Sequence, residues 1–363
     1  MKKTILLIYL LIFTIYAWGQ FHTMKMPTKS PKVSETQRLG ITDITIDYHS
    51  PAVRDRDIWQ KVVPFEGEPI PWRAGANMNT TIAFSTDVKI EENALKAGSY
   101  GLHVIPKNEG KWEILFANND NLWGSYYLDL EKDIVLKVMV TPEETNFSEQ
   151  LDFEFMNRKE DVVTVALEWG NKRIPFLVSV DLNKTVVDNF RYELRGINTY
   201  QWEAWNDAAT WCLDRNIYLE EALSWAERSI NGGYNGFASN KNLTNLATKA
   251  NILWALNRKT ESDATYNEFI TMMNDPNTAY RVSMDLQKRG REAMSLSILE
   301  EASKRFKGQW YVHLGYGKML YENGNPKKAV KELATALDQS PEQYKDYLEE
   351  LLDKMKNGEP MGS

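Results

Sequence analysis

The chain has 363 residues and carries 43 lysines and arginines against 50 aspartates and glutamates, for a formal net charge of −7. Because the acidic residues outnumber the basic ones, we do not expect the protein to bind nucleic acid, whose phosphate backbone is bound by clustered basic residues. The length exceeds what one hydrophobic core usually organises and fits two domains.

Residues 1–19 carry the three parts of a secretory signal peptide. Two lysines precede an apolar run from Ile5 to Tyr16, and Ala17-Trp18-Gly19 has the small-x-small pattern of a cleavage site. An uncleaved membrane anchor is the alternative, but the run is shorter than the ~20 residues that span a bilayer. We therefore expect an exported protein, periplasmic, envelope-associated or extracellular. Its mature chain would begin at Gln20, with residues 20–29 flexible and no later membrane span.

Apolar and polar residues alternate along residues 30–182. Ile44 and Ile46, for example, share one face, and Thr45 and Asp47 share the other. Alternation of this kind is typical of antiparallel strands that pack one face on a core and expose the other to water. Turn-forming residues separate the runs at short intervals. The pattern predicts an antiparallel β-sandwich, which we expect to be jelly-roll-like.

The period changes to that of helices near Thr199, after a connection over residues 183–198. The small residues that mark successive repeats are Ala222, Ala264, Ala293 and Ala329. Their separations of 42, 29 and 36 residues scatter around the ~34 residues of a tetratricopeptide unit, in which small residues let paired helices approach closely. We predict tetratricopeptide-like repeats over residues 199–356 and a tail over 357–363. A nonrepeating helical bundle is the alternative.

The clearest repeat lies near the C-terminus. A run from Leu314 to Tyr321 precedes the turn Asn323-Gly324-Asn325, and a second run extends from Pro326 to Leu337. This unit resembles a tetratricopeptide repeat, and residues 342–356 are expected to close the array with a polar outer face. The one cysteine, Cys212, lies among apolar residues of the helical half and is expected to be a buried structural thiol.

Several motifs of the β half occur in the order found in a known family. They include Gly40–Tyr48, Trp72–Asn77, Tyr100–Pro106, Trp123–Tyr127 and Arg173-Ile174-Pro175-Phe176. On these residues the stretch from Ser30 to Val180 resembles the bacterial domain of unknown function 2911. The resemblance implies an exported or envelope-associated domain and no particular activity. The chain departs from the family pattern at residues 66–71, which make the segment that precedes Trp72 longer.

Two of these motifs contain candidate recognition residues. Arg73 offers a planar fork that matches a carboxylate or a phosphate, and Asn77 and Thr81 follow in the same segment. Gly75 permits a tight turn. The segment is either an anion-recognising loop or a structural turn in which Arg73 pairs with an acid and Asn77 caps the turn.

His103 and His49 are the candidate histidines of the β half. Alternation places His103 opposite the apolar set that begins at Tyr100. There it can titrate, bind a metal or act as a general base, or simply bond a neighbouring strand. His49 shares a face with Asp47. A metal site would need both histidines on adjacent strands, and no H-x-H spacing supports one. Neither a metal nor another cofactor is predicted.

Trp123 opens an aromatic group, Trp123–Tyr127, that follows the polar run Asn118–Asn121. Aromatic rings beside amide and carboxylate side chains can stack on sugars, and the same composition suits rings that close the end of a sandwich. We find no G-x-S-x-G elbow, no phosphate-cradling glycine motif and no carboxylate pair at a telling spacing. The motifs therefore name no reaction.

These features leave two functional hypotheses. The first is a noncatalytic module whose β domain binds a small anionic or saccharide ligand, or packs into an assembly, while its repeats bind a protein or peptide. The second is a hydrolase of an envelope saccharide or peptide, with His103 as acid/base, Asp47 or Tyr48 assisting, and Arg73 and Asn77 holding the substrate. The missing nucleophile and metal motifs favour the first.

Overall fold

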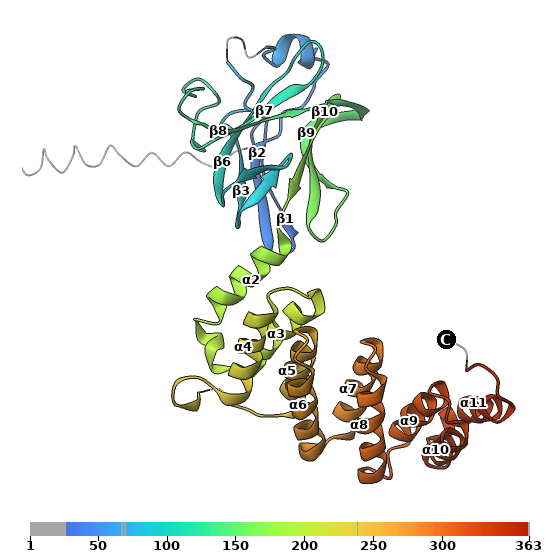
Figure 1. Cartoon of the computed structure of the whole chain (residues 1–363). Coiled ribbons are helices and arrows are strands. Elements are labelled where there is room, and N and C mark those ends of the chain that lie inside the picture. The colour runs from blue at the N-terminus through green and yellow to red at the C-terminus, as the bar shows by residue number, and fades with distance from the viewer. Residues whose placement is uncertain (1–26, 67, 69, 238, 362–363) are drawn as a thin grey trace, which may run out of the picture. The chain divides into compact units, whose positions relative to one another are not determined.

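The computed structural model describes residues 27–66, 68, 70–237 and 239–361. They form two compact units that divide between Thr185 and Val186 (Figure 1). The expected signal peptide lies outside the described residues. Within the described ranges, no helix is both long and apolar enough to cross a membrane.

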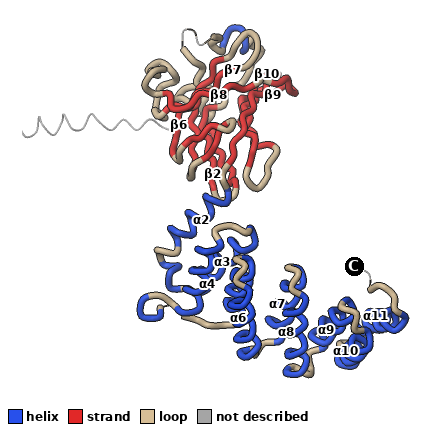
Figure 2. The backbone as a smooth tube through the Cα atoms, viewed as in Figure 1, coloured by secondary structure: helices blue, strands red, loops and turns tan. Residues whose placement is uncertain are grey.

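The first unit consists of two antiparallel β-sheets (Figure 2). The six-stranded sheet has the order β1 (Lys32–Leu39), β2 (Thr42–His49), β3 (Thr80–Phe84), β6 (Gly98–Ile105), β7 (Trp112–Ala117) and β8 (Ile134–Val140). The four-stranded sheet has the order β5 (Asn93–Leu95), β4 (Val88–Ile90), β10 (Val162–Ser179) and β9 (Glu143–Met156). The predicted antiparallel two-sheet architecture is confirmed.

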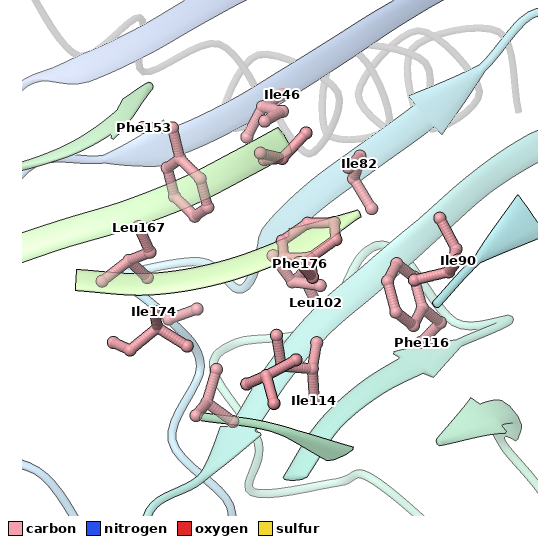
Figure 3. Packing of buried hydrophobic residues seen from close by; sticks show 14 of the residues in the cluster. Ile46, Ile82, Ile90, Leu102, Ile114, Phe116, Phe153, Leu167, Ile174 and Phe176 are labelled. Carbon is pink, nitrogen blue, oxygen red and sulfur yellow. The ribbon is translucent and has the colours of Figure 1, made fainter. Parts of the chain in front are cut away.

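The apolar faces of the two sheets share one core. Figure 3 shows Phe116 of one sheet and Phe153 and Phe176 of the other pointing into the same interior. The rings of Phe116 and Phe176 meet edge to face at 5.9 Å, an arrangement that aromatic pairs prefer. Alternation therefore placed the core side chains correctly, because successive side chains of a strand point to opposite faces of the sheet.

The chain closes one edge of the sandwich just after β2. Leu151 donates its backbone N–H to the Pro51 carbonyl at 2.9 Å, and Val53 donates to the Glu149 carbonyl at 2.8 Å. The segment from Pro51 to Val53 thus leaves the six-stranded sheet and pairs with β9 of the other sheet. This crossing fixes the position of the residues that follow it, Arg54 and Arg56.

The second unit is built of helices that pack in consecutive pairs (Figure 1). α2 (Leu182–Glu193) begins one residue before the segment expected to be a connection, residues 183–198, and occupies most of it. The pairs are α3 (Trp202–Arg215) with α4 (Leu219–Asn231), α5 (Leu243–Ala255) with α6 (Lys259–Met272), α7 (Pro276–Lys288) with α8 (Glu292–Arg305), and α9 (Trp310–Glu322) with α10 (Pro326–Gln339). α11 (Lys345–Asn357) packs on α10 as the closing helix.

The repeat is visible in where each pair begins. The first helices start at Trp202, Leu243, Pro276 and Trp310, so successive spacings are 41, 33 and 34 residues. The eighth residue of each first helix is small and buried, as is the fourth residue of each second helix. These residues are Ala209, Ala250, Ser283 and Gly317 in the first helices, and Ala222, Ser262, Ser295 and Ala329 in the second.

These small residues mark the closest approach within the pairs. Ser262 donates its hydroxyl to the Ala250 carbonyl at 2.6 Å, and a methyl group on Gly317 would lie 3.2 Å from the Ala329 carbonyl oxygen. Two of the expected marker residues, Ala264 and Ala293, are wrong because both are exposed. The residues that fill these places are serines, whose hydroxyls are satisfied by the partner helix.

Candidate functional site

The first unit contains a cavity of about 720 Å³ with a strongly basic lining. Its cationic residues are Lys29, Arg54, Arg56 and Arg73, and its aromatic residues are Trp72, Trp169 and Tyr126. Asn77 also contributes to the wall, and among the residues that the structure describes no aspartate or glutamate does. Basic and aromatic groups around a hollow of this size are typical of a binding site for an organic anion.

Backbone carbonyl groups hold the arginines of the cavity. Arg56 donates from Nη2 to the Ala52 carbonyl at 2.6 Å and from Nε to Val53 at 3.0 Å. Arg54 donates from Nη2 to the Lys29 carbonyl at 3.1 Å. Because a guanidinium has five N–H donors, these bonds orient each side chain and leave donors for a ligand.

Carboxylates do not neutralise this charge. Among the residues that the structure describes, none of the four cations forms an ion pair within 4.0 Å. The Glu149 carboxylate lies beside Arg54, but it accepts the backbone N–H of that residue, at 3.0 Å, and forms no ion pair with its guanidinium. The indole N–H of Trp169 is also buried without an acceptor among the described groups. That nitrogen is itself out of contact with solvent, so the donors that the cavity offers together with positive charge are those of its arginines.

Left-handed backbone conformations gather around the cavity. Arg54, Asp55, Ala74 and Asn77 have φ values of 50°, 55°, 53° and 60°. A non-glycine residue in this region costs of order 1 kcal/mol or more and persists only where the surroundings enforce it. For the segment from residue 73 to 77 the enforcement is visible. Thr80 donates its hydroxyl to the buried Ala74 carbonyl at 2.9 Å.

Two of the predicted recognition residues, Arg73 and Asn77, meet at the cavity. Arg73 donates from Nη1 to the backbone carbonyl of Asn77 at 2.6 Å, so Asn77 serves Arg73 through its main chain and not through its amide. The Arg73 guanidinium also lies over the Tyr126 ring, 5.2 Å from its centroid. The structure thus places Arg73 between the turn that follows it and an aromatic loop.

Thr81, His49 and His103 lie elsewhere, on the outer face of the six-stranded sheet. Thr81 pairs with Asp47 of β2 and Gly101 of β6. β3 separates the strands of His49 and His103, which puts their backbones roughly 10 Å apart. These histidines are therefore not on adjacent strands. Among the described residues, no cluster of three histidine, cysteine or acidic side chains is arranged to hold a metal ion.

His103 faces away from the main core, as alternation predicts, but a loop covers it. Its side chain is 0% exposed, and Nδ1 lies 2.7 Å from the hydroxyl of Ser125. Burial, assisted by the positive charge of Arg73 and opposed by Asp133, lowers the His103 pKa to about 4. His103 is thus neutral at neutral pH and has no access to a ligand in the cavity.

Trp123 lies in the loop that covers His103, but its own side chain is 67% exposed. Tyr126 and Tyr127 are exposed as well. Leu122 and Ser125 are buried in this loop, and Asn79 fixes Leu122 by two hydrogen bonds of 2.9 and 3.0 Å to its backbone. Of the aromatic group, Tyr126 lines the cavity and Trp123 does not.

Arg54 and Arg56 are cavity residues that the sequence analysis missed. Both lie shortly after the end of β2 at His49, and two arginines at i and i+2 beyond a strand end were the available signal. The pattern carries little weight alone, since it does not show which sheet edge the chain will reach.

A known protein family matches most of this unit. The model described as "Protein of unknown function (DUF2911)" matches residues 30–178. Residues 30–178 are a DUF2911 domain. The cavity belongs to this domain, apart from Lys29 immediately before it. Comparison with curated proteins gives no match.

Solved structures similar to this chain are tetratricopeptide proteins. One is described as "YrrB: a TPR protein with an unusual peptide-binding site", at 15% identity over 48% of this chain and 87% of that one, with a TM-score of 0.29. A second is MamA from Desulfovibrio magneticus RS-1, at 17% identity over 43% and 88% of the two chains, with a TM-score of 0.27. A third is the C-terminal part of a TPR repeat-containing protein from Cytophaga hutchinsonii, at 12% identity over 48% and 67%, with a TM-score of 0.34.

Proposed function

We propose that the DUF2911 domain binds a small anionic ligand in the basic cavity, as part of an exported, envelope-associated binding module. The observation that carries this proposal is the set of four cations without carboxylate partners among the described residues. In a chain with 50 acidic side chains, unpaired clustered cations cost stability through mutual repulsion unless an anion offsets them. Export rests on the signal-peptide pattern of residues 1–19.

The chemistry of the lining narrows the ligand to an anion with an apolar or planar part. Arginine forks match the planar oxygen pairs of a carboxylate or a phosphate. Trp72 and Trp169 stack on each other with ring centroids 5.9 Å apart at an angle of 14°, so they form a rigid aromatic wall of the cavity, although each is no more than 5% exposed. A neutral sugar would use the aromatic wall but would leave the guanidinium groups without a counter-charge.

Titration calorimetry on the full chain tests this proposal with inorganic phosphate, citrate and the neutral sugar maltose as probes. We expect phosphate or citrate to bind, and Arg56→Gln or Arg73→Gln to weaken binding about tenfold or more, as for a lost hydrogen bond to a charged group. Arg158→Gln is the matched control, because Arg158 is exposed and also bonds a carbonyl, that of Phe155. Binding of maltose alone, or equal weakening in the control, contradicts the proposal.

A second proposed role belongs to the helical repeats, which we infer bind a protein or peptide. Stacked helix pairs provide extended surfaces for such partners. The specific observation is a group of exposed large side chains around the first pair, namely Tyr192, Ile197, Tyr200, Tyr234 and Phe237. Exposed apolar groups of this number are typical of interaction sites.

The test uses the full chain as bait in envelope extract. The rings of Tyr200 and Phe237 touch at 5.7 Å while both remain exposed, so the double variant Tyr200→Ser, Phe237→Ser should fold normally. We expect it to lose a protein that the wild type retains, and Tyr347→Ser, at an exposed site on α11, to keep it. Equal capture by all three proteins contradicts this role for the patch.

The residues named as catalytic in the hydrolase alternative, His103, Asp47 and Tyr48, do not line the cavity. His103 is buried away from the cavity lining. Tyr48 points into the core and shares its hydroxyl with Glu35 and Asp152, whereas Asp47 faces outward and pairs with Lys32 at 3.4 Å. We therefore limit the proposal to binding.

A further inference from the structure

We propose that Gly124, Ser125 and Tyr126 hold the Arg73 guanidinium in its ligand-binding position, and that the buried His103 anchors this segment to the sheet. The inference rests on the proposed anion binding and assigns the residues that position one of its contacts. It also gives a common role to three separate motifs of the sequence, around residues 73, 103 and 124, which would together position one ligand-binding side chain.

Gly124 makes room for the guanidinium. A methyl group on Gly124 would lie 2.2 Å from Cζ and 2.5 Å from Nη1 of Arg73, closer than any real contact between such atoms. Gly124 also has φ 66°, which favours glycine. The guanidinium therefore lies directly against the main chain of the loop, where any other residue would displace it.

Tyr126 supplies the second surface for Arg73. Its ring lies 5.2 Å from Cζ of Arg73 and lines the cavity. A cation over an aromatic ring gains about 0.5–1 kcal/mol at an exposed site. The ring thus orients Arg73 without neutralising it, which a carboxylate in the same place would do.

Ser125 ties these two neighbours to the sheet. Its side chain is 2% exposed, and its hydroxyl lies 2.7 Å from Nδ1 of His103, on β6 inside the six-stranded sheet. Asn79 holds the same loop at Leu122. With Ser125 fixed between them, Gly124 and Tyr126 cannot move away from Arg73 independently.

Arg73 needs this support because its own bonds are few. Within the described residues, its guanidinium donates one hydrogen bond, from Nη1 to the Asn77 carbonyl. Ordering a long flexible side chain on binding costs affinity, and a side chain already held in place avoids that cost. Losing the support should weaken anion binding about threefold to tenfold, with the larger value for direct displacement of Arg73.

The test is a double-mutant cycle on the full chain, with inorganic phosphate and citrate as probes in titration calorimetry. Gly124→Ala should weaken binding about tenfold in the wild-type background and have no further effect once Arg73 is Gln, because it acts through Arg73. Gly110→Ala is the matched control: Gly110 also has a left-handed φ, 78°, but nothing lies within 4 Å of an added methyl group. It should leave affinity unchanged.

The anchor is tested with conservative pairs. Ser125→Ala should weaken binding about threefold, and Ser125→Thr, which keeps the hydroxyl, should restore it. His103→Asn keeps a polar atom near Nδ1 and should bind better than His103→Ala, whose folding is checked by circular dichroism. Tyr126→Phe should match the wild type, and Tyr126→Leu should not, since the ring and not the hydroxyl contacts Arg73.

The outcomes separate the inference from the proposed function. If the wild type binds neither probe, the anion-binding proposal fails and this inference with it. If Arg56→Gln loses binding while Gly124→Ala, Ser125→Ala and Tyr126→Leu all bind like the wild type, the cavity binds anions and the positioning role is overturned. Additive losses from Gly124→Ala and Arg73→Gln overturn it as well, because they show a general disturbance of the loop.

Discussion

Arginine side chains are held in two different ways in the two units. Several arginines of the helical unit are paired with carboxylates, among them Arg191 with Glu221 at 2.6 Å and Arg289 with Asp285 at 2.8 Å. In the cavity of the DUF2911 domain they are held by backbone carbonyls, as Arg56 is by Ala52. A paired arginine has its charge satisfied within the fold. A carbonyl-held arginine keeps its charge available, and where it also lines a cavity, as Arg56 does, that charge can serve a ligand.

The largest effect expected from this difference concerns Arg291 of the helical unit. Arg291 is 4% exposed, stacks on the Trp254 ring at 4.0 Å, and reaches Asp263 at 3.2 Å. Arg291→Ala should lower the free energy of unfolding by about 3 kcal/mol, since it removes both packing and a cation–π contact. Arg56→Gln should change it by less than about 1 kcal/mol.

Urea unfolding followed by circular dichroism at 222 nm measures the helical unit, which contains Arg291, and amide hydrogen exchange of the strands measures the unit that contains Arg56. Phosphate titration of the same samples completes the comparison, because Arg291→Ala should leave anion affinity unchanged. A large stability loss in Arg56→Gln would show that the cavity arginines are architectural, and the distinction between the two units would not hold.

A second, smaller effect concerns pH and His103. Its pKa of about 4 in the folded state lies below the ~6.5 of the unfolded chain, so the unfolded state takes up the proton first as the pH falls. The contribution is fully present above pH 6.5 and is lost on acidification towards pH 4, at about 1.4 kcal/mol per pH unit. At pH 5 the wild type should therefore have lost roughly 2 kcal/mol through this group alone.

His103→Asn isolates that contribution, because asparagine does not titrate while other acidic groups of the chain still do. The difference in unfolding free energy between wild type and His103→Asn is measured at pH 7 and at pH 5. The charges nearest to His103, Arg73 and Asp133, are unchanged in both proteins. A difference that stays constant between the two pH values would mean that His103 protonates freely in the folded state.

The sequence predicts those parts of the structure that depend on neighbours along the chain. Alternation located the strands and the outward face of His103, and helical periodicity located the repeats. Arg54 and Arg56 were not predicted as cavity residues. They reach the cavity because Pro51 pairs with Leu151 of β9, which is about a hundred residues further along the chain. The burial of His103 was not predicted for the same reason, because the loop that covers it, which contains Ser125, is distant in the sequence. Local periodicity carries no information on either long-range contact.

The repeat itself was predicted, but two of its expected small residues, Ala264 and Ala293, were wrong. The serines found in their place give the smallest of the expected effects on stability. Ser295, at the place assigned to Ala293, donates its hydroxyl to the Ser283 carbonyl of the facing helix at 2.8 Å. A serine that crosses to its partner helix should behave as part of the pair's core. Ser295→Ala should therefore lower the unfolding free energy by about 1 kcal/mol.

Ser297→Ala is the control for this last effect, because Ser297 is exposed on the same helix and donates to the Ala293 carbonyl one turn earlier at 3.1 Å. A hydroxyl that bonds its own helix competes with water and contributes little, so this variant should unfold at the wild-type urea concentration. Equal destabilisation by both variants would mean that the crossing bond has no special role. The small residues would then mark the repeat by their size alone.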